Sequence, residues 1–130
     1  MLFAQLQIGD IHEGGYVFQV NEDGTSLVAA LEGLGAMPWD DGMAAAEAST
    51  DGGYSDWYLP SYEELTLIYN TVGPGGENGN IGGFETSSNP FYWSSTVVGE
   101  EGNSWVVFFI HAGSNVNNHH FSYRIHPVRL

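Results

Sequence analysis

The chain lacks cysteine and lysine altogether, and its 130 residues include only two arginines. The absence of cysteine excludes disulfides, thiolate metal sites and a cysteine nucleophile. Sixteen acidic residues against the two arginines give a formal net charge of −14 at pH 7. A surface of that sign repels phosphate backbones and anionic lipids, so neither nucleic acid nor a membrane surface is an expected partner. Two explanations of the acidity stay open, solubility in a salty medium and an acid-lined cation site.

Long hydrophobic runs are missing as well. No stretch reaches the roughly 18 apolar residues of a membrane span, so we expect no membrane insertion. The N-terminus has no basic start and too short an apolar run for a secretory signal. We expect no signal peptide in this chain, so a protein that works outside the cell would be part of a larger exported chain or leave by another route, such as phage lysis.

The length corresponds to one domain, which we place at residues 8–130. Residues 1–7 form a short lead, and an apolar strip runs through Leu2, Phe3, Leu6 and Ile8. We expect this strip to be buried against a neighbouring subunit or the rest of a larger assembly. The expected assembly is a homo-oligomer, with a trimer as one candidate, because several copies of a weak binding site gain avidity together.

Alternating and apolar segments predict the strands. A hairpin is expected from strands at 16–20 and 26–31, with Asp23-Gly24 in the turn because this pair tolerates positive φ. The segment 105–111 is apolar on both faces, which is typical of a strand in the middle of a covered sheet. A terminal strand is expected at 122–130. With two helices between the hairpin and these last strands, the order predicts an α+β fold.

Two helices are expected between the hairpin and the later strands. The first, at 43–48, would be capped by Asp40 or Asp41. The second is marked by the capping box of Ser61 and Glu64. Its apolar face is formed by Tyr62, Leu65, Ile68, Tyr69 and Val72. The glycine-rich segment 73–89 after it is predicted to be a long loop within the domain, with an interdomain linker as the less suitable alternative.

Several blocks of the chain resemble the family named after the C-terminal domain of the Legionella collagen-like adhesin. The blocks that carry the resemblance are GYSDWYLPS at 53–61 with Glu64-Leu65, YWSST at 92–96, Trp105, and RIHPVR at 124–129. Shorter ones lie at 8–10, 14–18 and 27–30. The resemblance covers the chain from about residue 8 to its end. It implies a C-type-lectin-like fold, in which small twisted antiparallel sheets are flanked by two helices and the terminal strands pair.

The resemblance also implies a function in binding. Members of the family resemble adhesins that bind sugars or sulfated polysaccharides, phage virion proteins, and the variable proteins of diversity-generating retroelements. The loops around 97–104 and 112–120, rich in asparagine and histidine, are the expected ligand surface. The residues to which we assign ligand binding are Asn103, His111, Asn115, Asn117, Asn118, His119, His120 and Tyr123. Their composition fits diversified positions and also fits ordinary exposed turns.

Other residues of the same blocks are expected to be structural. These are Trp57, Pro60, Trp93, Trp105, Arg124 and Arg129. The three tryptophans are predicted core residues, whereas Trp39, beside Pro38, is the one we expect to be exposed. The two arginines lie five residues apart, so on one strand they would point to opposite faces, and each is expected to form an ion pair.

We expect no metal site and no cofactor, with calcium as the one candidate. Glu100 and Glu101, with Asn103, could bind a hard cation or sugar hydroxyls, but they also suit a solvated acidic loop. The sequence lacks the Glu-Pro-Asn or Gln-Pro-Asp and Trp-Asn-Asp motifs of calcium-dependent lectins. His111 and His119 could meet across a hairpin and bind zinc, although a plain polar surface is the simpler interpretation.

The chain is not expected to be an enzyme. Formylglycine-generating enzymes share the fold but use cysteine, and no nucleophile elbow or suitably paired carboxylates occur. Two functions stay open. The first is a receptor- or glycan-binding module of a phage or adhesin, with a cell-surface glycan or protein receptor as partner. The second is a structural virion component, such as a capsid or fibre decoration protein, that uses the same surface to contact other virion proteins.

Overall fold

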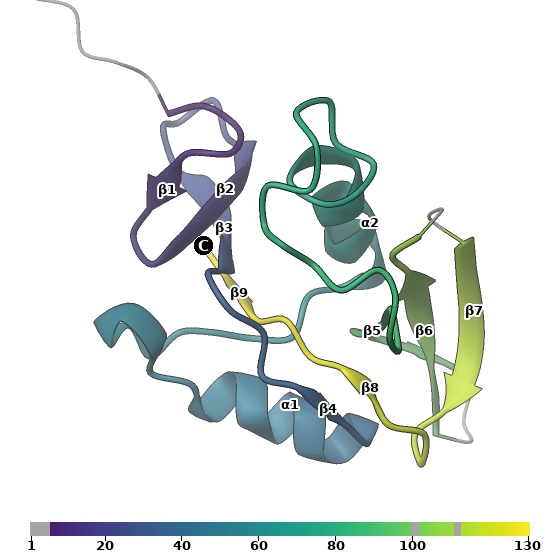
Figure 1. The fold of residues 1–130 in the computed structure, drawn as a ribbon. Coiled ribbons are helices and arrows are strands. Elements are labelled where there is room, and N and C mark those ends of the chain that lie inside the picture. The colour runs from purple at the N-terminus through teal and green to yellow at the C-terminus, as the bar shows by residue number, and fades with distance from the viewer. Residues whose placement is uncertain (1–5, 100–101, 111–112) are drawn as a thin grey trace, which may run out of the picture.

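The strands of the protein form two sheets (Figure 1). The computed structural model describes residues 6–99, 102–110 and 113–130. The first sheet has the order β1-β2-β3-β9 and the second β4-β8-β5-β6-β7. Neighbouring strands are antiparallel, except that β5 and β8 are parallel. The strands are β1 Ile11–His12, β2 Gly15–Val20, β3 Ser26–Ala30, β4 Ala36–Met37, β5 Phe91–Val98, β6 Asn103–Phe108, β7 Gly113–Asn118, β8 Tyr123–Arg124 and β9 Val128–Arg129. The helices are α1 Trp39–Ala48 and α2 Tyr62–Thr71, with a short 3-10 helix at Asp51–Gly53.

These elements confirm the predicted α+β class and the hairpin at its start. Strand β2 pairs with β3 in antiparallel register from Gly15 opposite Ala30 to Val20 opposite Ser26. Gly24 has a φ of 89°, which is the positive value predicted for the turn. The long segment between α2 and β5 contains no helix or strand, as predicted.

Helix α2 confirms the capping box. The backbone N–H of Glu64 donates to Ser61 Oγ (3.1 Å), and the N–H of Ser61 donates to Glu64 Oε1 (2.9 Å). Its predicted apolar face is buried at Leu65, Ile68 and Tyr69. The helix therefore begins and packs as its local sequence dictates.

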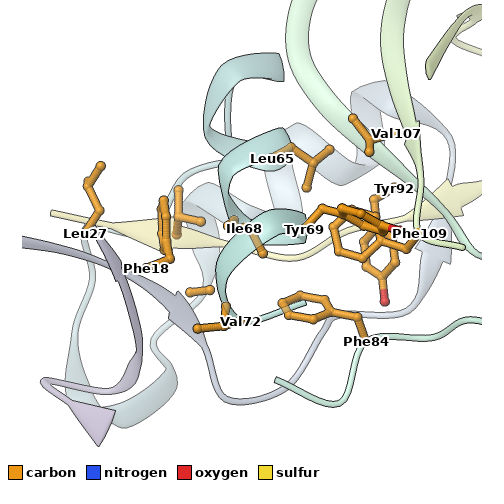
Figure 2. Packing of buried hydrophobic residues seen from close by; sticks show 12 residues of the cluster. Phe18, Leu27, Leu65, Ile68, Tyr69, Val72, Phe84, Tyr92, Val107 and Phe109 are labelled. Atoms are coloured by element: carbon orange, nitrogen blue, oxygen red, sulfur yellow. The ribbon is translucent and has the colours of Figure 1, made fainter. Parts of the chain in front are cut away.

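The main core lies around that face of α2 (Figure 2). Phe18 and Leu27 reach it from the first sheet, and Val107 and Phe109 reach it from β6 and its end. Burying a side chain of this size contributes about 1.5–3 kcal/mol. One helix thus holds the two sheets together.

Helix α1 begins earlier than predicted. It starts at Trp39, with Pro38 as N-cap and no side-chain hydrogen bond to the cap. Asp40 and Asp41 do not cap it, because they lie inside the first turn. Carboxylates there still favour the helix through its dipole. The prediction missed the start of α1 because Pro38, at the N-cap, has a ring that fixes φ but no hydroxyl or carboxylate that could cap the helix.

The prediction of one terminal strand at 122–130 is wrong. The segment forms two separate two-residue strands, β8 in the second sheet and β9 in the first. Between them lie Ile125, His126 and Pro127, all buried. Pro127 has no N–H to donate to a ladder, which favours the break. Arg124 and Arg129 therefore do not occupy opposite faces of one strand, as we had predicted, but belong to different sheets.

The YWSST block forms an irregularity in β5. Three residues, 94–96, stand opposite Trp105 alone. Ser94 Oγ donates to the Trp105 carbonyl (2.7 Å), and Thr96 Oγ1 accepts from the N–H of Tyr62 at the start of α2 (2.9 Å). The backbone N–H of Ser95 donates to the Pro60 carbonyl (2.8 Å). The hydroxyls replace missing ladder bonds and attach the strand to the helix.

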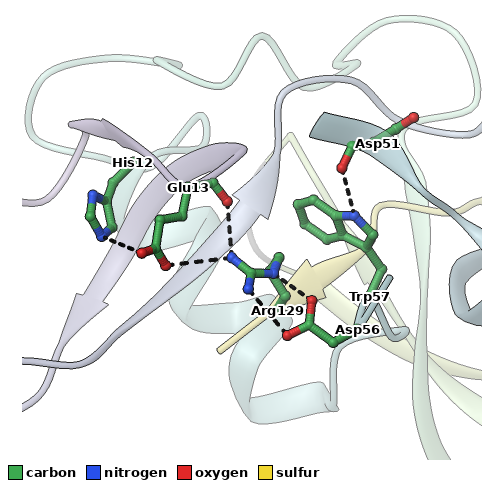
Figure 3. A network of polar contacts seen from close by, with 6 residues as sticks. All are labelled: His12, Glu13, Asp51, Asp56, Trp57 and Arg129. Atoms are coloured by element: carbon green, nitrogen blue, oxygen red, sulfur yellow. Dashed lines mark hydrogen bonds and ion pairs between the residues drawn. The ribbon is translucent and has the colours of Figure 1, made fainter. Parts of the chain in front are cut away.

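The GYSDWYLPS block attaches the C-terminus (Figure 3). Asp56 accepts two hydrogen bonds from Arg129, one from Nε at 2.6 Å and one from Nη2 at 3.2 Å. Arg129 Nη1 also donates to the Glu13 carbonyl (3.0 Å), and the guanidinium lies 3.8 Å from the centre of the Tyr54 ring. Trp57 is 2% exposed and donates to the Asp51 carbonyl. These contacts join the first sheet to the loop before α2.

Part of the predicted N-terminal strip can be located. Leu6 packs against the small core cluster of Val17, Val28 and Trp57, so it contacts its own domain. Ile8 is 41% exposed. Leu2 and Phe3 lie outside the described residues, as do Glu100, Glu101 and His111.

Candidate functional site

The second sheet packs one face against α2, and α1 covers part of the other face, where Trp93 and Val106 are fully buried. Residues paired directly across antiparallel strands share a face, so Tyr92, Val107 and Ser114 lie on the α2 side. The alternate residues, Trp93 with Val106 and Asn115, lie on the other side. Helix α1 covers that side around Trp93, through residues such as Ala46. Beyond α1 the face is accessible.

Four aromatic rings follow one another along this open face. The ring centroids are 4.6 Å apart from Phe108 to Phe91, 5.2 Å from Phe91 to Tyr123, and 5.9 Å from Tyr123 to Phe121. Phe121 is 54% exposed, and the other three are half-buried. We call these four residues the aromatic strip. They come from β5, from β6, and from β8 with the turn before it, so the sheet register brings them together.

A shallow groove runs beside the strip. It has a volume of about 310 Å³ and is lined by Phe91, Val106, Phe108, Gly113, Ser114 and Asn115. Asn115 and Asn117, paired opposite Val106 and Ser104, share the open face. Amide side chains carry both donors and acceptors, so the site combines flat apolar rings with polar groups.

His119 closes one end of the open face. Its ring stacks on Trp39 with centroids 3.9 Å apart and meets Trp93 edge-on at 5.9 Å. The Nε2 atom is 2.7 Å from Ser104 Oγ. Burial is the main cause that lowers the pKa of His119 below its usual value. The ring is therefore held in place and favours the neutral form.

Trp39 is not the exposed residue that we predicted. It is half-buried, and its Nε1 donates to the Ser94 carbonyl (3.0 Å). Trp105 is also half-buried, packed against Tyr62 at 5.1 Å on the α2 side, whereas Trp93 is fully buried. Trp39 is half-buried instead of exposed because the turn after β7 brings the His119 ring onto it.

The predicted ligand residues divide between the two faces. Asn115, Asn117 and Tyr123 lie on the open face beside the groove or in the strip. Asn103 and Asn118 pair with each other on the α2 side, so they do not join that group. Exposed His120 and half-buried His119 follow β7 in a turn, while His111 lies outside the described residues.

Three of the four strip residues were missed by the sequence reasoning. Phe91 and Phe108 belong to apolar strands and resembled core residues, and Phe121 stands in a polar loop. The signal that could have indicated the strip was the position of Phe108. This residue falls on the same strand face as Val106, opposite to the face of Val107.

Arg124 differs from the prediction that each arginine forms an ion pair. Its Nε donates to the Asn89 carbonyl and its Nη2 to the Ser88 carbonyl, both at 2.8 Å. No ion pair of Arg124 occurs among the residues that the structure describes. Over the same residues, no three His, Asp or Glu side chains converge as metal ligands, and neither helix is long and apolar enough to span a bilayer.

Comparison with known protein families gives a match over most of the chain. A family model described as the Lcl C-terminal domain matches residues 18–129. No curated protein matches the chain. The match confirms the predicted family and, together with the two helices and two sheets, the C-type-lectin-like fold. It identifies an adhesin-associated module.

Proposed function

Because the chain belongs to the Lcl C-terminal domain family, we propose that it is a non-catalytic binding module of a cell or virion surface. Its ligand would be a glycan, held by the aromatic strip and the adjacent groove. The observation that carries this proposal is the run of four rings, with Asn115 in the groove beside them and Asn117 on the same face of the sheet. Aromatic rings pack against the apolar C–H faces of sugars, and amides hydrogen-bond their hydroxyls.

The charge of the chain favours an uncharged glycan as the ligand. The chain has sixteen acidic residues and only two arginines. Arg129 is 8% exposed and bound to Asp56, and Arg124 donates to backbone carbonyls. Neither arginine lines the groove. A sulfated or uronic-acid polysaccharide would meet repulsion without a compensating cation, so neutral sugars are the better fit.

A glycan array followed by titration calorimetry on the purified domain tests the proposal. We expect neutral oligosaccharides to bind and heparin not to bind. Asn115→Ala and Phe121→Ala should each weaken binding about fivefold or more, because each removes a contact worth about 1 kcal/mol or more. Asn103→Ala is the matched control, since it removes the same amide from the opposite face of the sheet.

Three results would contradict the proposal. Heparin binding would refute the charge argument. An equal loss of affinity in Asn103→Ala and Asn115→Ala would refute the assignment to the open face. Absence of glycan binding, with self-association that Phe121→Ala abolishes, would instead support an assembly surface of a structural virion component.

A further inference from the structure

A second pocket lies away from the groove, where the loop after β3, the loop before β5 and the β8–β9 connection meet. Its volume is about 270 Å³, and it shares no lining residue with the groove. Polar and charged side chains in its lining are Glu32, Glu85, Tyr92, Arg124 and His126. Four glycines complete the wall, so backbone also faces the space.

His126 offers this pocket a hydrogen-bond acceptor. The side chain is 4% exposed, and its Nε2 lies 2.6 Å from the Ala30 carbonyl. A carbonyl only accepts, so Nε2 carries the proton. Burial lowers the pKa of His126 to about 4, and the neutral ring therefore has a lone pair on Nδ1.

The surroundings leave Nδ1 open to a ligand. Among the residues that the structure describes, the Ala30 carbonyl is the one hydrogen-bond partner of the His126 ring. A Cβ placed on Gly33 would lie 3.3 Å from Nδ1. Gly33 therefore keeps a side chain away from this atom, at the wall of the pocket.

Tyr92 offers a donor from the same wall. It is 4% exposed, and its hydroxyl oxygen accepts from the backbone N–H of Glu85 (2.9 Å). Burial raises the pKa of Tyr92, so the phenol keeps its proton. No acceptor for that proton occurs within the described part of the chain. The centroids of the Tyr92 and His126 rings are 6.3 Å apart.

We propose that this pocket binds a small uncharged molecule with several hydroxyl groups, such as a polyol or a single sugar ring. One hydroxyl accepts from Tyr92 and donates to His126 Nδ1. A carboxylate cannot donate to Nδ1, and an ammonium has no lone pair for the Tyr92 hydroxyl. The two carboxylates of the lining outnumber Arg124, which further disfavours an anion. The volume equals that of about nine waters at about 30 Å³ each, enough for such a ligand.

Nuclear magnetic resonance of the 15N-labelled domain tests this pocket. Glycerol, glucose, galactose and mannose are the probes, and acetate and methylammonium are the charged comparisons. We expect at least one neutral probe to shift the His126 Nδ1 resonance at concentrations up to about 100 mM, since so small a ligand binds with millimolar affinity. Neither charged probe should do so.

Matched variants assign the binding to the two side chains. Tyr92→Phe should weaken it at least tenfold. Tyr69→Phe removes a hydroxyl from another buried tyrosine of the same core, outside the pocket, and should leave binding unchanged. Gly33→Ala should also reduce binding, because the new Cβ crowds Nδ1. Asn115→Ala, in the groove, should not affect it, which separates this site from the proposed glycan surface.

Specific outcomes would overturn the inference. No shift of His126 Nδ1 with any neutral probe would do so, as would an equal shift with acetate. A loss in Tyr69→Phe as large as that in Tyr92→Phe would show that the effect is general softening of the core. Thermal melts of each variant establish that the compared proteins are folded at the temperature of measurement.

Discussion

His126 should make this domain lose stability in mild acid. The imidazole is buried, and its pKa is lowered from the usual 6.5 to about 4, mainly by desolvation. The unfolded chain takes up a proton on this ring below about pH 6.5, whereas the folded chain resists until about pH 4. The free energy of unfolding should therefore be insensitive to this group above pH 6.5 and fall as the pH decreases through that window.

The size of the loss follows from the same pKa. A difference of one unit between the pKa values of the unfolded and folded states corresponds to about 1.4 kcal/mol of stability. Because the pKa of His126 falls from 6.5 to about 4, its titration should lower the free energy of unfolding by about 3 kcal/mol. Domains typically have a free energy of unfolding of about 5–15 kcal/mol, so this loss would be a large part of the total. The charged groups that face the ring are Glu32, Glu85 and Arg124, which line the same pocket as His126.

Urea unfolding followed by tryptophan fluorescence, from pH 7.5 to pH 4, measures this loss. Carboxylates also titrate in acid, so the informative quantity is the difference between the natural chain and His126→Gln, whose amide can still donate to Ala30. The stability advantage of the natural residue should shrink by about 3 kcal/mol as the pH falls. Parallel curves would refute the reasoning, as would an imidazole that titrates near 6.5 in the folded protein.

Two further perturbations test the packing. Gly42→Ala should destabilise the domain by about 1–3 kcal/mol despite alanine's higher helix propensity, because its Cβ would overlap Ile125 Cδ1 and lie 2.9 Å from Cγ1. Adding Ile125→Val, which removes Cδ1, should cost less in that background than alone in a double-mutant cycle, and a stabilising Gly42→Ala would contradict the packing. Arg129→Lys should cost about 1–2 kcal/mol in urea unfolding, because lysine cannot make the two-point contact with Asp56, which is itself partly exposed. A neutral effect would show that the contact contributes nothing to stability.

Features built from near neighbours were predictable. The turn at Gly24 needs only the local φ preference, and the capping box needs only Ser61 and Glu64, three residues apart. Strand and helix periodicity then identified the buried face of α2. Such interactions lie within one turn or one hairpin, so their partners are already adjacent in the unfolded chain.

The errors lie where distant segments meet. Trp39 becomes half-buried because His119, eighty residues further along the chain, stacks on it. The terminal segment divides between two sheets because β9 pairs with β3 of the hairpin while β8 pairs with β4 and β5. Neither partner choice is readable from local propensity, since both depend on packing and strand order.

Short-range pattern was sufficient for the α+β class, the motif blocks at 53–61, 92–96 and 124–129 for the family, and composition for the excess of acidic over basic residues. The tertiary structure alone decided which asparagines share a face and which aromatic rings form a strip. A one-residue change of register would move Asn115 to the α2 side, and the spacing along one strand cannot show which face is covered. The same holds for the pocket at His126, because its acceptor and donor come from separate segments and depend on the burial that only the folded chain provides.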